Sequence, residues 1–126
     1  MEMRTPLAKV RGLGSAKNGT DHFWLQRMTA VANIFLVIFM VYLIVGLIGA
    51  DHKTVKTELA RPHVAILLLL LVVSGIYHMR LGMQTVIEDY IKSDGAKVFG
   101  LMLNTFFAIL VGLTCVFAIL KLSFGA

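Results

Sequence analysis

Residues 75–90, GIYHMRLGMQTVIEDY, place a histidine, carboxylates and tyrosines directly after a run of leucines and valines. If this segment is helical, a rotation of about 100° per residue puts His78 on one face with small residues. These include Ser74, Gly75, Gly82 and Thr85. Such a face suits a flat, bulky group, and imidazole is a common axial ligand of haem iron. Small residues also let transmembrane helices pack closely, so haem binding and simple packing are both open interpretations.

The same segment ends in a second polar group. Tyr90 lies about 18 Å beyond His78 if the helix continues, and Glu88 and Asp89 precede it. A phenol can donate a hydrogen bond to a carbonyl oxygen, and a carboxylate can hold or relay protons. Both suit the head group of a quinone, which takes up protons when it is reduced. The alternative is an interfacial tyrosine anchor beside solvated acidic residues.

The other histidines do not complete a haem site with His78. His63 is about 22 Å away along a continuous helix, so the two cannot share one iron. Its place at the predicted helix start favours an interfacial position over a second haem. His22 lies next to an aromatic cluster with Trp24, which is typical of a membrane interface, and neither His22 nor Asp21 receives a role. A second axial ligand is expected from another chain.

Composition indicates an integral membrane protein. Hydrophobic residues make up 58% of the chain and charged residues only 15%, and the mean hydropathy is +0.83. The single cysteine, Cys115, lies in an apolar run and provides neither a disulfide framework nor a cysteine metal motif. The net charge of +5 comes from residues scattered around apolar segments, so we expect a lipid bilayer and no nucleic acid as partner.

The predicted fold class is an all-α integral membrane protein with three transmembrane helices. The spans are expected at about residues 24–50, 62–90 and 97–121, joined by short connections. The strictly apolar part of the second span, residues 64–77, is too short to cross unless its polar continuation is also helical and partly embedded. A small-residue face in the third span predicts a helix-packing seam; it consists of Thr105, Ala108, Gly112 and Cys115.

Basic residues predict the orientation. Residues 1–22 read as a flexible basic arm, and residues 23–126 as one membrane domain whose first span is retained. Basic residues on the side of the N-terminus are Arg4, Lys9, Arg11, Lys17, Arg27, Arg80, Lys92 and Lys97. They outnumber those on the other side, which are Lys53, Lys56, Arg61 and Lys121. The N-terminus is therefore predicted in the cytoplasm and the C-terminus outside. With so little hydrophilic mass, the chain is expected to be a non-catalytic subunit.

Two motifs resemble the small hydrophobic membrane anchor subunit of bacterial succinate dehydrogenase, respiratory complex II. One is the spacing of His78, Gly82, Asp89 and Tyr90. The other is GTDHFWLQRMTA, residues 19–30, which is similar to the family's segment ending in Arg, any residue, Thr-Ala at the start of the first helix. With three spans in the matching order, the resemblance covers nearly all of the chain from Gly19.

The resemblance implies half of a two-subunit haem-binding helical bundle. His78 would be one axial ligand of a b-type haem, haem b, and the larger cytochrome b anchor subunit would provide the other. Arg27 would lie near the haem propionates, and Ser74, Gly75 and Gly82 would face the haem. Tyr90 would hydrogen-bond ubiquinone close to the iron–sulfur subunit, with Asp89 in a supporting or proton-handling role.

The implied function is electron transfer in the cell inner membrane. A flavoprotein subunit would oxidise succinate, a step of the tricarboxylic acid cycle, and pass electrons through iron–sulfur clusters to ubiquinone. The chain has no glycine-rich FAD fingerprint and no cysteine cluster motif, which agrees with that division of labour. The alternative is a small membrane transporter or assembly subunit with a polar path at the end of the second helix. The absence of acidic residues from 28–50 and 98–120 counts against it.

Overall fold

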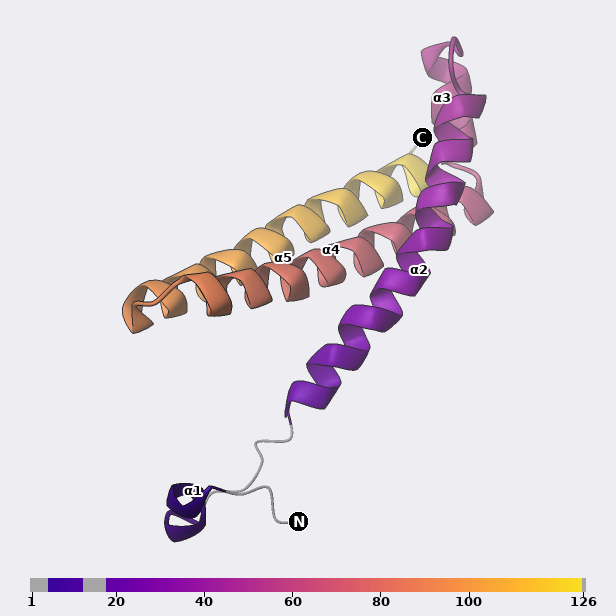
Figure 1. Cartoon of the computed structure of the whole chain (residues 1–126). Helices are drawn as coiled ribbons and strands as arrows, with labels where there is room; N and C mark the ends of the chain where they lie inside the picture. The colour runs from indigo at the N-terminus through magenta and orange to yellow at the C-terminus, as the bar shows by residue number, and fades with distance from the viewer. Residues whose placement is uncertain (1–4, 13–17, 126) are drawn as a thin grey trace.

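The computed structural model describes residues 5–12 and 18–125. This part of the chain is helical, with short connections, as Figure 1 shows. The helices are α1 (Pro6–Val10), α2 (Asn18–Gly46), α3 (His52–Leu59), α4 (Pro62–Tyr90) and α5 (Asp94–Phe124).

Three of these helices, α2, α4 and α5, are long and apolar enough to cross a membrane. They contain 29, 29 and 31 residues, so each is at least about 40 Å long and exceeds a hydrocarbon core of about 30 Å. The prediction of an all-α protein with three transmembrane helices is therefore confirmed for the described residues. Helix α4 continues without a break to Tyr90, so the polar sequence that follows the apolar run is helical.

Helix α2 begins earlier than the predicted span. Residues 18–22, which the sequence placed in a flexible arm, form its first turns, and Asp21 lies there. A carboxylate near a helix N-terminus is favourable because it faces the positive end of the helix dipole. Of the predicted arm, residues 1–4 and 13–17 lie outside the described residues.

The first predicted connection contains a helix of its own, α3. The Asp51 side chain caps it by accepting a hydrogen bond from the Thr54 backbone N–H at 3.3 Å. Hydrogen bonding from Thr54 lowers the pKa of the Asp51 carboxyl, because the bonds favour its charged form. Near the other end, Arg61 Nε and Glu58 Oε2 form an exposed ion pair at 3.1 Å. Proline follows directly as the first residue of α4, where its missing N–H is not needed.

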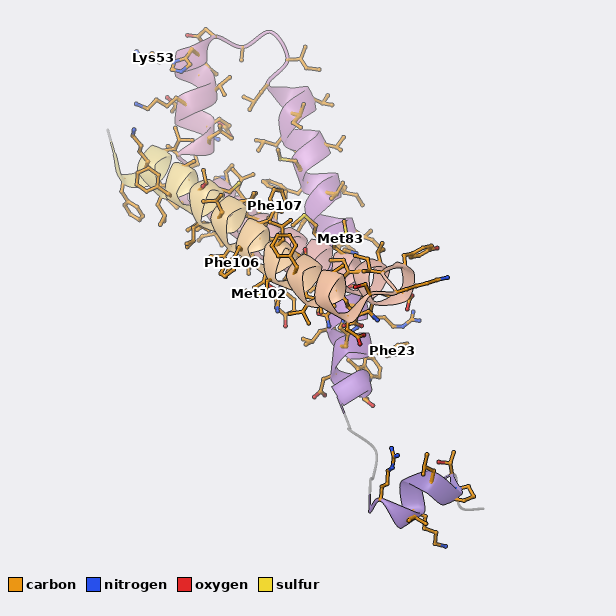
Figure 2. The ribbon with its side chains drawn as sticks, turned by 90° about the vertical axis from the view of Figure 1, so that its left-hand side faces the viewer. Phe23, Lys53, Met83, Met102, Phe106 and Phe107 are labelled. Atoms are coloured by element: carbon orange, nitrogen blue, oxygen red, sulfur yellow. The ribbon has the colours of Figure 1, made fainter. Side chains whose placement is uncertain are left out.

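Helix α4 is the middle element. It packs against α2 on one side and α5 on another, whereas the backbones of α2 and α5 do not come close to each other within the described part of the chain. In Figure 1, α4 and α5 run antiparallel side by side and α2 crosses them. At the α3 end, Leu43, Val64 and Leu68 form a small buried core. Large apolar side chains elsewhere are exposed, as Figure 2 shows for Met102 and Phe106 on α5, as expected of surfaces that meet lipid or another subunit.

The contact between α4 and α5 is close and mostly apolar. Ala108 is 2% exposed, and a Cβ on Gly112 would meet Ile76 at 3.5 Å. Asn104, 9% exposed, donates a hydrogen bond from Nδ2 to the Arg80 backbone carbonyl at 2.9 Å. Ala108 and Gly112, two residues of the predicted seam, thus lie between α4 and α5. The hydrogen bond of Asn104 joins the two helices.

Candidate functional site

Near the start of α2 the contact between α2 and α4 is polar, whereas at the α3 end it is the apolar core of Leu43, Val64 and Leu68. Four polar residues of α2 recur every three or four positions and therefore share one face of the helix. They are His22, Gln26, Thr29 and Asn33. Two of them meet α4 directly: Thr29 bonds His78, and Gln26 Nε2 lies 3.3 Å from where a Cβ on Gly82 would be. The polar face of α2 is thus directed at the His78 face of α4.

Thr29 holds the imidazole of His78. Its Oγ1 lies 3.0 Å from His78 Nδ1 and donates its proton to the Leu25 carbonyl at 2.7 Å. A hydroxyl has only one proton to donate, so in the tautomer in which Nδ1 carries the hydrogen, Thr29 accepts from His78 and donates to the Leu25 carbonyl. In neutral His78 the lone pair is then on Nε2. No hydrogen-bond partner for Nε2 is present in the part of the chain that the structure describes.

A cleft of about 400 Å³ adjoins this histidine. Its lining includes His22, Phe23, Gln26, Arg27, His78 and Thr85. The Arg27 guanidinium carbon lies 4.2 Å from the centre of the Phe23 ring, an arrangement that holds the cation by a cation–π contact; Figure 2 labels Phe23 near the start of α2. The structure therefore brings together two predicted site residues, His78 and Arg27.

Some buried polar atoms at the cleft have no hydrogen-bond partner among the described residues. His22 Nε2 and Gln26 Oε1 are buried without a hydrogen-bond partner among them, and Asn33 Oδ1 further along α2 is in the same state. A buried polar atom without a partner costs about 1–3 kcal/mol. A bound group or a partner subunit that supplied hydrogen bonds here would remove that cost. The sequence assigned no role to Gln26 or Thr29. The available signal was the recurrence of polar residues every three or four positions within an otherwise apolar helix.

The three small residues predicted to face a haem differ in their surroundings. Ser74 Oγ donates to the Thr29 carbonyl at 3.5 Å, and Gly82 lies against Gln26, so both face α2 of the same chain. Gly75 has no neighbouring atom within 4 Å of the position a Cβ would take. Of the three, only Gly75 leaves open space that a group outside the chain could occupy.

Asp89 and Tyr90 lie apart from this cleft, in the last turn of α4. Tyr90 is 81% exposed and Asp89 is also exposed. Glu88, beside them, accepts a hydrogen bond from Gln84 Nε2 at 2.8 Å. The two residues stand at the turn between α4 and α5, where another subunit can reach them.

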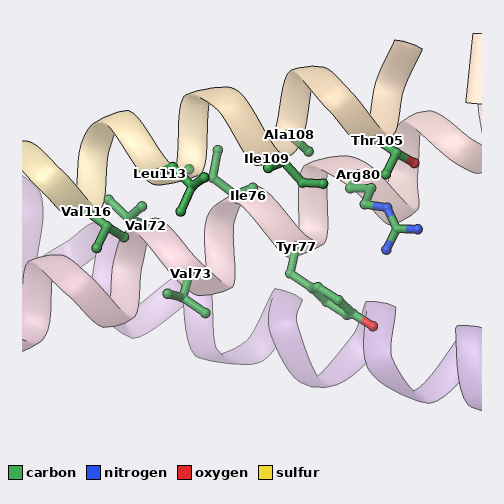
Figure 3. A pocket seen from close by; sticks show the side chains of 11 residues that line it. Val72, Val73, Ile76, Tyr77, Arg80, Thr105, Ala108, Ile109, Leu113 and Val116 are labelled. Carbon is green, nitrogen blue, oxygen red and sulfur yellow. The ribbon is translucent and has the colours of Figure 1, made fainter. Parts of the chain in front are cut away.

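A second hollow lies between α4 and α5 and has a volume of about 420 Å³. Its walls are aliphatic, with Tyr77, Arg80 and Thr105 at one end (Figure 3). Within residues 5–12 and 18–125, no three or more His, Cys, Asp or Glu side chains gather as a metal site. A haem iron differs from such sites because the porphyrin supplies four of its ligands, and a chain need add only one.

Fold and site together define a three-helix membrane subunit with a histidine-bearing polar cleft between its first two spans. The family model described as succinate dehydrogenase/fumarate reductase transmembrane subunit matches residues 1–120. The chain therefore belongs to this family, as a membrane anchor subunit of succinate dehydrogenase. It is associated with the membrane and with the other subunits of that complex.

Individual relatives are consistent with this family assignment. A succinate dehydrogenase hydrophobic membrane anchor subunit of Rickettsia bellii is 38% identical over 93 residues, which is 74% of this chain and 74% of the relative. The subunit of the same name from Paracoccus denitrificans is 29% identical over 126 residues, 100% of this chain and 97% of the relative. That from Rickettsia conorii is 34% identical over 92 residues, 72% of this chain and 73% of the relative. No solved structure matches the chain significantly.

Proposed function

We propose that the chain supplies one axial ligand, His78, to a b-type haem shared with the larger cytochrome b anchor subunit. The observation that carries the proposal is the bonding of the imidazole. Nδ1 lies 3.0 Å from Thr29 Oγ1, and with Nδ1–H donating to that oxygen, Nε2 keeps its lone pair for an iron. Histidines that bind metals in proteins almost always donate their other ring N–H in this way, because the bond fixes tautomer and ring orientation.

The residues around His78 also fit a haem. Arg27 lines the same cleft and provides a positive charge for a propionate, and the unpartnered His22 Nε2 adds a polar group. Gly75 offers space for a flat ring beside the ligand. When bound, haem supplies a reversible one-electron carrier. The chain's own contributions are the ligand nitrogen, a cation and a small-residue surface, and the partner subunit provides the rest.

Tyr90 and Asp89 are proposed to take part in the reduction of ubiquinone. Tyr90 is exposed at the end of α4, so its hydroxyl can donate a hydrogen bond to a quinone carbonyl oxygen. Asp89 can hold a proton for the reduced oxygen. In this proposal the iron–sulfur subunit covers the site and delivers electrons that the flavoprotein subunit takes from succinate.

The proposed setting is the cell inner membrane, with the N-terminus in the cytoplasm. The excess of basic residues on that side supports this orientation. It places the Tyr90 end of α4 at the cytoplasmic face, where soluble subunits that carry flavin and iron–sulfur clusters would bind.

His78→Ala tests the ligand assignment. In the purified complex we expect the b-type haem absorption band to disappear or shift strongly, because the iron loses an axial nitrogen. His63→Ala is the matched control, since His63 is an exposed histidine at the opposite end of α4. A His78→Ala complex whose haem spectrum equals that of the wild type would remove the assignment.

Tyr90→Phe tests the quinone site. Loss of one hydrogen bond of about 1.4 kcal/mol is expected to lower quinone reduction roughly tenfold, while succinate oxidation by an artificial acceptor stays unchanged. Tyr42→Phe is the control, because Tyr42 is similarly exposed, at 80%, but lies on α2. If Tyr90→Phe lowers both activities equally, the defect is one of assembly and Tyr90 has no specific role at the quinone.

A further inference from the structure

We infer that Thr29 is a positioning residue that sets the tautomer and the electron-donating strength of the His78 ligand. This inference rests on the proposed ligation of haem by His78 and adds a residue on another helix to that site. Thr29 does not itself ligate the iron in this inference. Thr29 acts through the imidazole that it bonds.

The geometry is a relay of two hydrogen bonds that crosses from α4 to α2. His78 Nδ1 lies 3.0 Å from Thr29 Oγ1, to which it donates in the inferred tautomer, and the Thr29 hydroxyl donates to the Leu25 carbonyl at 2.7 Å. A second backbone carbonyl, that of Gln26, lies 3.1 Å from the same hydroxyl. Whichever carbonyl takes the proton, the hydroxyl oxygen is left as an acceptor for Nδ1–H.

The backbone of Thr29 is fixed at the same place. Ser74 Oγ, one turn before His78 on α4, donates to the Thr29 carbonyl at 3.5 Å. Thr29 is therefore tied to α4 through both its side chain and its backbone. Since the contact is partly buried, it is weakly screened and its partners have little freedom to turn away.

This relay has an electronic consequence. An imidazole whose N–H is engaged by an acceptor is a stronger donor at its other nitrogen. The acceptor is itself polarised by donating onward to a backbone carbonyl, which strengthens the bond. A stronger donor stabilises ferric over ferrous iron, so the bond to Thr29 is expected to hold the haem midpoint potential lower than it would otherwise be.

The experiment uses the purified, haem-loaded complex with Thr29→Val, Thr29→Ser and, as control, Thr114→Val. Valine keeps the branched shape and removes the hydroxyl, whereas serine restores the hydroxyl without the methyl group. Thr114 lies on α5, away from the residues that line the cleft, and its hydroxyl bonds the Leu110 carbonyl of its own helix at 2.8 Å. The readouts are the haem midpoint potential, the electron paramagnetic resonance signal of the ferric haem, and the ratio of haem to protein.

We expect Thr29→Val to raise the midpoint potential, change the ferric signal and weaken haem retention on the order of tenfold. Thr29→Ser should restore all three values, and Thr114→Val should match the wild type. The inference is overturned if Thr29→Val keeps the wild-type potential and signal. It is equally overturned if serine behaves like valine, because the packing of the side chain would then be what matters.

Failure of the proposed function gives a different result. If His78→Ala retains a wild-type haem spectrum, His78 is not the ligand, and the Thr29 variants have no ligand to act on. If His78→Ala abolishes the spectrum while Thr29→Val leaves the potential unchanged, haem ligation stands and only the role of Thr29 falls.

Discussion

Helix α4 packs against two long helices, and around His78 its contact with α2 differs in character from its contact with α5. Towards α5 it presents a close apolar seam in which Ala108 is almost fully buried and Asn104 has its partner in the Arg80 carbonyl. Towards α2 it presents His78, which is hydrogen-bonded to Thr29 of α2 beside a cleft. Three buried polar atoms on α2 lack a partner among the described residues.

This difference suggests that the α4–α5 contact is the structural scaffold and that the α2–α4 contact carries the candidate site. Packing and satisfied hydrogen bonds drive helix association within a bilayer, and the α4–α5 seam meets both conditions without outside help. The α2–α4 contact does not meet them, because polar groups inside a membrane are costly unless paired. Because these groups lack partners among the described residues, we expect a bound group or a partner subunit to complete the α2–α4 contact.

The largest effect is expected from a substitution in the seam between α4 and α5. Ala108→Leu forces a larger side chain between α4 and α5, at a cost of about 1–3 kcal/mol, and we expect the amount of assembled complex in the membrane to fall severely. Immunodetection of the chain and its partner subunits after membrane solubilisation measures this. All activities should fall together with the protein. A normal amount of complex would show that the seam is not the scaffold.

A smaller and more selective effect is expected on the side of the site. Gly75→Ala adds a methyl group that meets no atom of the chain within 4 Å, so the subunit should assemble normally. Because Gly75 is proposed to face haem, absorption or haem content should change, though less than in His78→Ala. Gly46→Ala, at the end of α2 and equally free of neighbours, is the control. Identical haem properties in both variants would argue that Gly75 does not face haem.

The smallest effect is expected outside both interfaces, at the cap of α3. Because hydrogen bonds from Thr54 lower the pKa of Asp51 in the folded chain, its stabilising effect is full above the unfolded value of about 3.9. That effect is lost as the pH falls through the lower folded pKa. The protection of the backbone amides of residues 52–59 against hydrogen exchange, relative to the intrinsic rate at each pH, should therefore fall at low pH, and Asp51→Ala should lower it already at neutral pH. Unchanged exchange in Asp51→Ala would contradict the cap.

Sequence alone predicted the fold well because hydrophobic length is a strong signal in membranes. The three spans are confirmed, including the polar extension of α4 to Tyr90. Helix α3 was missed because its eight residues are too polar and too short for a periodicity signal. Its N-cap aspartate was the one local sign. The start of α2 was placed too late because polarity, rather than helix propensity, marked the span.

The site could be predicted only in part. The resemblance named His78, Arg27, Asp89 and Tyr90, and the structure places the first two at one cleft and the last two in the last turn of α4. Periodicity grouped Ser74, Gly75 and Gly82 but could not tell which of them meets α2 of the same chain. The role of Thr29 could not be read from the sequence, because a hydrogen bond between helices depends on their relative rotation and height.

Because α2 packs against α4 but not closely against α5, the lifetime of the subunit in the cell should depend on its partners. Among the described residues, α4 is the only long helix that α2 packs against closely, so in a copy made in excess of its partners the buried polar atoms of α2 would stay without hydrogen-bond partners. Such a copy should be a ready target for membrane quality-control proteases. Its half-life would then depend on the supply of the other subunits, which would hold the amounts of the components in step without any further regulation.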